Sequence, residues 1–176
     1  FATKPIDLDD LSITIEKAIE QINYIKMSQQ EHVQLESLKT DLAVAAEIQQ
    51  AILPRIFPPF PENSHELDLA AKMTPAKDVG GDFYDFFRID EDRIGIVMAD
   101  VSGKGIPAAI FMGVSRTLVR SIGLQGYTPG ECLTKSNDLL SKESVDCMFV
   151  TVFYAIYNVK TGEIEYSNGG HNSPVI

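Results

Sequence analysis

The first third of the chain carries apolar residues at helical spacing. In Leu8–Ile22 they recur every three or four residues, which predicts an amphipathic helix. A second run, Leu35–Ile52, repeats the pattern with heptad steps that are typical of a coiled coil or of a helix lying on another helix. The apolar register is interrupted, because Ile22 and Leu35 are 13 residues apart, one short of two heptads, and the intervening residues 26–32 are largely polar. This slip predicts a distorted supercoil or a hinge at residues 26–32, or else two ordinary amphipathic helices with a polar joint.

The pattern changes after a group of prolines, which cannot continue a helix: Pro54, Pro58, Pro59 and Pro61. From there to the end of the chain, short β-rich runs flank two helical patterns. We expect strands at His65–Met73, Phe83–Ile89, Ile94–Ala99, Met148–Asn158 and Glu163–Ser167, and helices at Pro107–Gly123 and Thr128–Leu140. Lys160-Thr161-Gly162 is a hairpin signal between the last two strands. This order along the chain, in which strands are followed by helices and then by more strands, predicts an α+β fold, a layered β-sandwich with flanking helices.

The composition is that of a soluble globular chain, with 44% hydrophobic and 23% charged residues over 176 positions. The net charge of -10 argues against nucleic acid and membrane as partners, because both attract a basic face. The longest purely apolar stretch, Ile94–Ala99, is far too short to cross a bilayer. Cys132 and Cys147 make no disulfide framework, so we expect a cytoplasmic protein. The chain begins with Phe1 and not with Met, which predicts a piece of something longer.

Two aspartates lie at predicted strand ends beside glycines. Asp82 follows Gly80-Gly81, and Asp100 follows the apolar run Ile94–Ala99, although aspartate is depleted in strands. If the two strands are antiparallel neighbours, both carboxylates converge at one edge of the sheet. Carboxylates so placed repel each other unless a cation lies between them, and Mg²⁺ or Mn²⁺ prefer such oxygen ligands. Capping of a turn or of the following helix by Asp100 is an equal alternative.

Other chemistries have weaker support. Gly103-Lys104-Gly105 lacks the spacing of a P-loop. The chain has three histidines and no Cys-x-x-Cys or His-x-x-x-His pair, which argues against a zinc site. Ser115 lies in a helical pattern that lacks the second glycine of a nucleophile elbow. His171 follows a glycine-rich turn, where it either forms hydrogen bonds within the turn or orients a ligand or water.

Five ordered segments resemble the PPM-type serine/threonine phosphatases of the SpoIIE/RsbU branch: Ala46–Pro54, Val79–Asp85, Ala99–Ala109, Met148–Thr151 and Asn168–Pro174. The resemblance covers residues 46–176. Separately, Ala2–Asp7 with the helix that follows is similar to the end of a response-regulator receiver domain, where a Lys-Pro pair precedes the last helix. Together these resemblances imply a receiver-like end at residues 1–24, a helical linker and possible coiled coil at 25–53, and a phosphatase domain at 54–176.

The phosphatase resemblance implies a two-layered β-sandwich with two Mn²⁺ or Mg²⁺ ions in a cleft at its edge. In that family the aspartates of the Gly-Gly-Asp and Asp-x-x-Gly motifs bind the ions. This matching assigns the metals and the catalysis to Asp82 and Asp100, with the backbone carbonyl of Val101 as a further ligand. The implied reaction is in-line attack of an activated water on a phosphoserine or phosphothreonine, without a covalent phosphoenzyme.

Two departures from the family pattern matter. Eukaryotic members carry a histidine after the metal-binding aspartate as a proposed proton donor, whereas Val101-Ser102 stands here. The family also continues beyond the position of Ile176 to a late Asp-Gly segment with another metal-binding aspartate. Asp138 and Asp146 lie in the wrong context to replace it. We therefore expect a C-terminally incomplete domain and a fragment that is nearly inactive by itself.

The hypothesis that results is a metal-dependent phosphoprotein phosphatase of a bacterial response regulator. The implied substrate is a phosphorylated regulatory protein such as an anti-sigma-factor antagonist. A catalytically silent signalling module that binds its partner without hydrolysis is the alternative. In either case residues 8–53 are expected to form a homodimer that couples an upstream phosphorylation to the rest of the chain.

Overall fold

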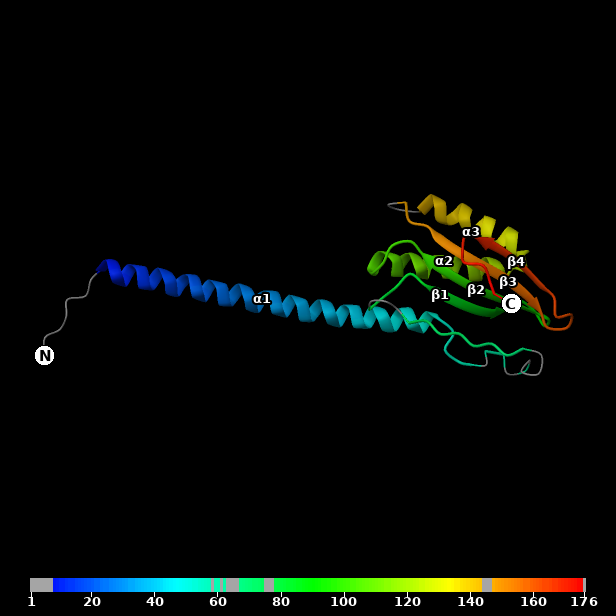
Figure 1. The fold of residues 1–176 in the computed structure, drawn as a ribbon, viewed down its shortest axis with the longest axis horizontal. Helices are drawn as coiled ribbons and strands as arrows, with labels where there is room; N and C mark the ends of the chain where they lie inside the picture. The colour runs from blue at the N-terminus through cyan, green and yellow to red at the C-terminus, as the bar shows by residue number, and fades with distance from the viewer. Residues whose placement is uncertain are drawn as a thin grey trace. The chain divides into compact units, whose positions relative to one another are not determined.

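The computed structural model describes residues 8–57, 59–60, 62, 67–74, 78–143 and 147–175 (Figure 1). The chain divides into two compact units, residues 1–43 and 44–176. In chain order the elements are α1 (Leu8–Ile52), β1 (Phe83–Arg88), β2 (Arg93–Val101), α2 (Ile106–Gly123), α3 (Pro129–Glu143), β3 (Val150–Asn158) and β4 (Ile164–Gly169). The last residues of α1, from position 44 onward, belong to the second unit.

The helical prediction for the first third of the chain is confirmed, but the predicted hinge is wrong. α1 is one continuous helix of 45 residues, and it is not two helices with a joint. Residues 26–32 are polar, yet they contain neither proline nor glycine, so the backbone hydrogen bonds continue through them. The segment Ala2–Asp7, which carries the receiver resemblance, lies outside the described residues. Of the helices that the structure describes, none combines the length and the hydropathy needed to span a bilayer.

The end of α1 is stabilised by a side chain that follows it. Arg55 donates from Nε to the carbonyl of Gln50 at 2.8 Å and from Nη2 to the carbonyl of Glu47 at 3.2 Å. Carbonyls of the last helical turn have no partner within the helix, so the bond to Gln50 satisfies one of them, together with the N–H of Leu53 at 3.3 Å. Leu53 is then buried in the core of the second unit, and Pro54 prevents the helix from continuing, as predicted.

The strand predicted at His65–Met73 is absent from the part of this segment that the structure describes, residues 67–73. The alternation that suggested it is real, since Leu67, Leu69, Ala71 and Met73 are half-buried and the residues between them are exposed. A β-strand also needs a hydrogen-bonded neighbour, and none of the described strands pairs with this segment. The prediction was therefore right about the faces and wrong about the pairing.

The second unit is built on a four-stranded antiparallel sheet in the order β1-β2-β3-β4. These strands and the helices α2 and α3 confirm the predictions for residues 83–169, each to within a few residues at its ends. In Figure 1 both helices lie on the same side of the sheet, α2 over β1 and β2 and α3 over β3 and β4. This is an α+β arrangement, as predicted.

The helices and the sheet bury a continuous apolar core. Its centre includes Phe87, Met112 and Tyr154, each at most 1% exposed. Two glycines allow the Phe87 ring to fit, since a Cβ at Gly95 or at Gly123 would lie 2.6 or 2.7 Å from that ring. Any larger residue at either position would displace the ring, because such close contacts are repulsive.

A buried carboxylate joins α2 to β1. Asp85 is 1% exposed, and it pairs with Arg116 Nε at 2.8 Å and with Arg120 Nη1 at 2.7 Å. The two arginines are four residues apart on α2 and therefore lie on one face of that helix. Removing one partner of such a buried pair would leave an uncompensated charge, which typically costs about 3–5 kcal/mol. The pair therefore determines which face of α2 meets the sheet.

The other face of the sheet is only partly covered by the described residues. Met98, Ile164 and Tyr166 point to this face by strand alternation and are 44–59% exposed. The predicted sandwich has a second layer on such a face. The described residues form one sheet and leave these side chains in contact with solvent.

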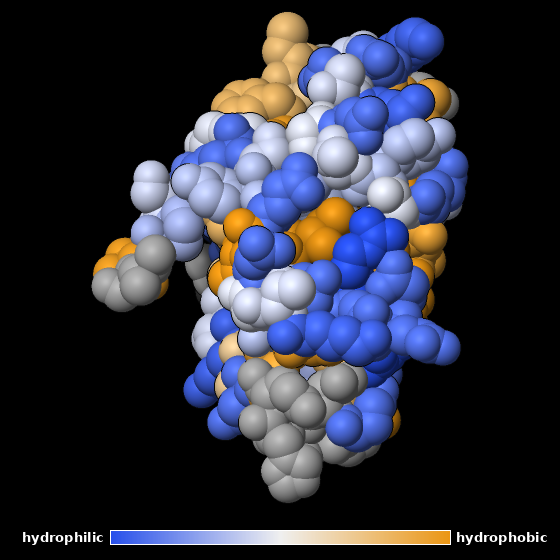
Figure 2. Space-filling view, turned by 90° about the vertical axis from the view of Figure 1, so that its right-hand side faces the viewer, coloured by the Kyte–Doolittle hydropathy of each residue, from blue (hydrophilic) through white to orange (hydrophobic). Residues whose placement is uncertain are grey.

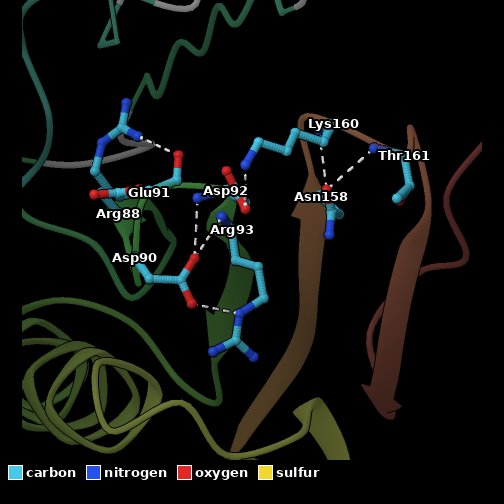
Figure 3. A network of polar contacts seen from close by, with 8 residues as sticks. All are labelled: Arg88, Asp90, Glu91, Asp92, Arg93, Asn158, Lys160 and Thr161. Carbon is cyan, nitrogen blue, oxygen red and sulfur yellow. Dashed lines mark hydrogen bonds and ion pairs between the residues drawn. The ribbon is translucent and has the colours of Figure 1, made fainter.

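The two hairpin turns lie side by side and are linked (Figure 3). Asp90 Oδ1 accepts from the backbone N–H groups of Asp92 and Arg93, and Lys160 Nζ pairs with Asp92 at 2.9 Å. Asn158 Oδ1 accepts from the backbone of the following turn. Figure 2 views this end of the second unit, where hydrophilic side chains surround a small hydrophobic area. These contacts hold the register of both hairpins at the end of the sheet opposite to the two aspartates.

The two thiols provide a test of this packing. Burial raises the pKa of the Cys132 thiol to about 11, whereas Cys147 is exposed. At pH 8 only about one Cys132 in a thousand is then a thiolate, the form that reacts. We expect a disulfide reagent such as DTNB to modify one thiol per native chain rapidly and two after denaturation. Fast modification of both thiols in the native protein would contradict the position of α3.

Candidate functional site

The predicted convergence of Asp82 and Asp100 is confirmed. β1 and β2 pair antiparallel with Phe83 opposite Ala99, so the residue before β1 and the last exposed residue of β2 meet at the same edge. Both aspartates are exposed, in contrast to Asp85 three positions further along β1. The edge they share is therefore open to solvent and to ligands.

The two carboxylates interact directly. Partial removal from water raises the pKa of Asp82, and a side-chain hydrogen bond with Asp100 and the charge of Asp100 raise it further. The nearby His171 opposes this shift and lowers the pKa of Asp82. Two carboxylates this close repel each other, and a cation between them would relieve the repulsion.

Val101, the third predicted ligand residue, lies directly below the Asp82 loop. Its side chain is 1% exposed, and its carbonyl approaches Gly81 so closely that a Cβ there would lie 2.9 Å from the oxygen. Only glycine at position 81 permits this approach without displacing the backbone. The Gly-Gly pair before Asp82 therefore has a packing role, which the sequence motif alone does not reveal.

A second group of polar residues adjoins Asp100 from β3 and from the turn after β4. Thr151 is the direct neighbour of Asp100 across the β2–β3 pair, and its hydroxyl donates to the Asp100 carbonyl at 3.3 Å. Thr151 Oγ1 also lies 3.0 Å from His171 Nδ1. His171 thus forms the hydrogen bonds expected of a turn histidine, and its ring lies beside the two aspartates.

The loop that carries Asp82 is held by a residue that the sequence did not single out. Gln49, near the end of α1, is 5% exposed. Its Nε2 donates to the Gly80 carbonyl at 2.6 Å, and its Oε1 accepts from the Gly80 N–H at 3.1 Å. A glutamine in a helix is ordinarily a surface residue, so only its place within the Ala46–Pro54 motif pointed to it.

The described residues offer a divalent cation two carboxylates and one carbonyl. Among them, no group of three or more His, Cys, Asp or Glu side chains is close enough to hold an ion by itself. Asp82 and Asp100 fit a hard cation that keeps several of its oxygen ligands as water, which Mg²⁺ usually does. The donor set does not fit zinc, which prefers nitrogen and sulfur. The roles of Asp82, Asp100 and Val101 as ligands remain predictions.

A cavity of about 870 Å³ lies away from these residues. It is lined by α2, α3 and β3 through side chains such as Phe111, Leu140 and Val152. Strand alternation places Val152 on the face of the sheet that the helices cover, whereas Asp100 and Thr151 point to the other face. The cavity is therefore separate from the aspartate edge.

Comparison with known proteins agrees with this geometry. Residues 90–176 match the sequence model of a family described as Stage II sporulation protein E (SpoIIE). Phosphoserine phosphatase RsbU of Bacillus subtilis (strain 168) is 33% identical over 167 residues, which is 93% of this chain and 48% of RsbU. Phosphoserine phosphatase RsbP of the same organism is 25% identical over 137 residues, 76% of this chain and 33% of RsbP. The chain thus spans less than half the length of these curated relatives.

A solved structure, the SiaA-PP2C domain of Pseudomonas aeruginosa, superposes with a TM-score of 0.60 at 20% identity. The match covers 76% of this chain and 53% of the SiaA domain. At this identity the likeness concerns the fold, and it agrees with the predicted α+β phosphatase-like architecture.

The role of Gln49 is testable without any ligand. Replacing it with methionine, which has a similar volume and no amide, leaves the Gly80 N–H without its acceptor. We expect a loss of about 1–3 kcal/mol in the free energy of unfolding and faster hydrogen exchange at the Gly80 amide. Gln50→Met is the matched control, because Gln50 is the exposed neighbour on the same helical turn. Equal exchange rates at Gly80 in both variants would contradict the role of Gln49.

Proposed function

Because the chain belongs to the SpoIIE/RsbU branch of the PPM-type phosphatases, we propose that it is part of a metal-dependent protein serine/threonine phosphatase. The observation that carries the proposal is the meeting of Asp82 and Asp100 at one open edge of the sheet. Cys132 is buried in the core and Cys147 lines the separate cavity, which favours hydrolysis without a covalent cysteine intermediate.

In this proposal Asp82, Asp100 and the carbonyl of Val101 hold Mn²⁺ or Mg²⁺, with two ions expected in the complete domain. When bound, the ions supply an activated water and neutralise charge on the phosphoryl oxygens. The chain's own residues position the two aspartates. Gln49 holds the loop before Asp82, and the β1–β2 pair holds Asp82 against Asp100.

For the substrate we propose a phosphorylated regulatory protein such as an anti-sigma-factor antagonist. The name phosphoserine phosphatase, which RsbU and RsbP share, supports the residue type. We further propose a cytoplasmic response regulator with a receiver end at residues 1–24, a helical linker at 25–53 and the phosphatase domain at 54–176. The surplus of acidic residues supports protein over nucleic acid or anionic membrane as the partner.

A second candidate function is a signalling module that binds its partner without hydrolysis. One observation favours it, namely that the described residues bring two acidic side chains to the site and not three. In that case the 176 residues bind a phosphorylated partner, and metal does not increase turnover. The fragment being nearly inactive by itself is common to both proposals.

The metal assignment leads to a direct test. In the intact protein, Asp82→Asn and Asp100→Asn should each lower Mn²⁺-dependent hydrolysis of a phosphoserine peptide by at least about 100-fold, because each removes one anionic ligand. Their circular dichroism spectra should match the wild type. Asp138→Asn is the control, since Asp138 is exposed on α3 and lies outside the site. Near-normal turnover in either site variant would refute the assignment.

We also propose that α1 forms a homodimer through its apolar stripe. Leu38 is 50% exposed within the first unit, as are several other large apolar residues of α1 to a similar degree: Leu11, Ile15, Ile22 and Leu35. In a lone helix such a stripe stays in water. A second copy of the helix would bury it, and each Å² of apolar surface buried stabilises the dimer by roughly 25 cal/mol. The 45-residue length of α1 is sufficient for several heptads.

Light scattering tests the dimer. Replacing Leu38 and Leu42 by aspartate puts charge into the stripe and should halve the measured mass, because the interface would bury unpaired carboxylates. Replacing Ser37 and Thr40 by aspartate adds the same charge away from these two leucines and should leave the mass unchanged. A Leu38/Leu42 variant with the mass of the wild type would exclude α1 as the interface.

A further inference from the structure

We infer that His171 binds the phosphoryl group of the substrate, with Thr151 orienting its ring. The inference rests on the proposed phosphatase function, and it concerns residues outside the predicted ligand set. Its basis is the chain of contacts from Asp100 through Thr151 to His171, which three separate strands bring together.

The ring of His171 is fixed by one of its two nitrogens. Nδ1 lies 3.0 Å from Thr151 Oγ1, and the same hydroxyl donates to the Asp100 carbonyl at 3.3 Å. Thr151 is opposite Asp100 in the β2–β3 pair, so the sheet fixes its backbone, and rotation of its side chain would break both hydrogen bonds. The imidazole is thereby connected to the backbone of a predicted ligand residue.

The backbone of His171 is fixed as well. Its N–H donates to Asn168 Oδ1 at 2.8 Å, and its carbonyl accepts from Asn168 Nδ2 at 3.0 Å. Between them Gly170 adopts a φ of 80°, a left-handed conformation that favours glycine. This closed turn at the end of β4 returns the chain toward Thr151, whose methyl group would lie 3.9 Å from a Cβ at position 170. Ring and backbone are therefore positioned before any ligand arrives.

The remaining nitrogen, Nε2, forms no hydrogen bond with any residue that the structure describes, and the side chain is half-buried. Because the Thr151 hydroxyl gives its proton to the Asp100 carbonyl, Nδ1 donates to Thr151, and Nε2 of the neutral ring is an acceptor that can take a hydrogen bond from a protonated phosphoryl oxygen. The neighbouring carboxylates repel a phosphoryl group, so a hydrogen-bonding group beside them would help to hold that group at the same edge. His171 is close enough to Asp82 to influence its pKa, which places the ring at this edge.

Matched substitutions separate the two ring nitrogens. The amide of asparagine reaches about as far as Nδ1 and can keep the bond to Thr151, whereas the amide of glutamine reaches about as far as Nε2. We expect His171→Asn to weaken binding of inorganic phosphate and of p-nitrophenyl phosphate about 10- to 100-fold, the usual loss of a hydrogen bond to a charged group. His171→Gln should restore most of the affinity. Thr151→Val should weaken binding less, and Thr151→Ser should restore it.

The measurements are the inhibition constant of phosphate, the KM for p-nitrophenyl phosphate, and direct calorimetric titration of phosphate, each on the intact protein with Mn²⁺. Mn²⁺ affinity and the melting temperature should stay at wild-type values in both His171 variants. His32→Asn, the same change at an exposed position on α1, is the control and should alter none of these values.

Three outcomes would overturn the inference. One is a His171→Asn variant that binds phosphate as tightly as the wild type. Another is a parallel loss of Mn²⁺ affinity or of stability, because His171 would then act only through the fold. The third is a wild type that binds no phosphate with Mn²⁺ present. A wild type that binds phosphate but hydrolyses nothing would refute the proposed function instead, and the phosphate titrations would still decide the role of His171.

Discussion

The register of the β1–β2 hairpin is the constraint on which the site depends. Phe83 opposite Ala99 brings the residue before β1 next to the exposed end of β2, and this alone makes Asp82 and Asp100 neighbours. A slip by one residue would turn the Asp100 side chain toward the helices and bury it in an apolar core, at a cost of several kcal/mol. The same register carries over to β3, where it sets Thr151 beside Asp100.

Two buried polar side chains connect this hairpin to helices. Asp85 ties β1 to α2 through two arginines, and Gln49 ties the loop before β1 to the end of α1. Each replaces contact with water by specific partners, so each favours one arrangement of its helix over the many that apolar packing would tolerate. The position of Asp82 therefore depends on α1, and the position of β1 depends on α2.

Much of this could be predicted from local pattern. Strands, helices and turns between residues 83 and 169 follow from alternation, helical spacing and glycine, and the meeting of Asp82 with Asp100 follows from an antiparallel hairpin. The contacts of Gln49 with Gly80 and of Thr151 with Asp100 could not be predicted, because they join residues 31 and 51 positions apart. The prediction of a hinge in α1 was wrong for a different reason. A shift in the position of an apolar stripe indicates how a helix packs against its partner. Residues that break helices, such as proline and glycine, decide whether the helix backbone continues.

The linked turns at the far end of the sheet have a consequence for motion. Lys160 and Asp92 join the two hairpins there, at the end of the sheet where no chemistry is expected. At the opposite end β1 begins and β4 ends, and strand ends that lack a closing turn fray with the lowest free energy. The strands are therefore expected to move most at the end of the sheet that carries Asp82 and Asp100.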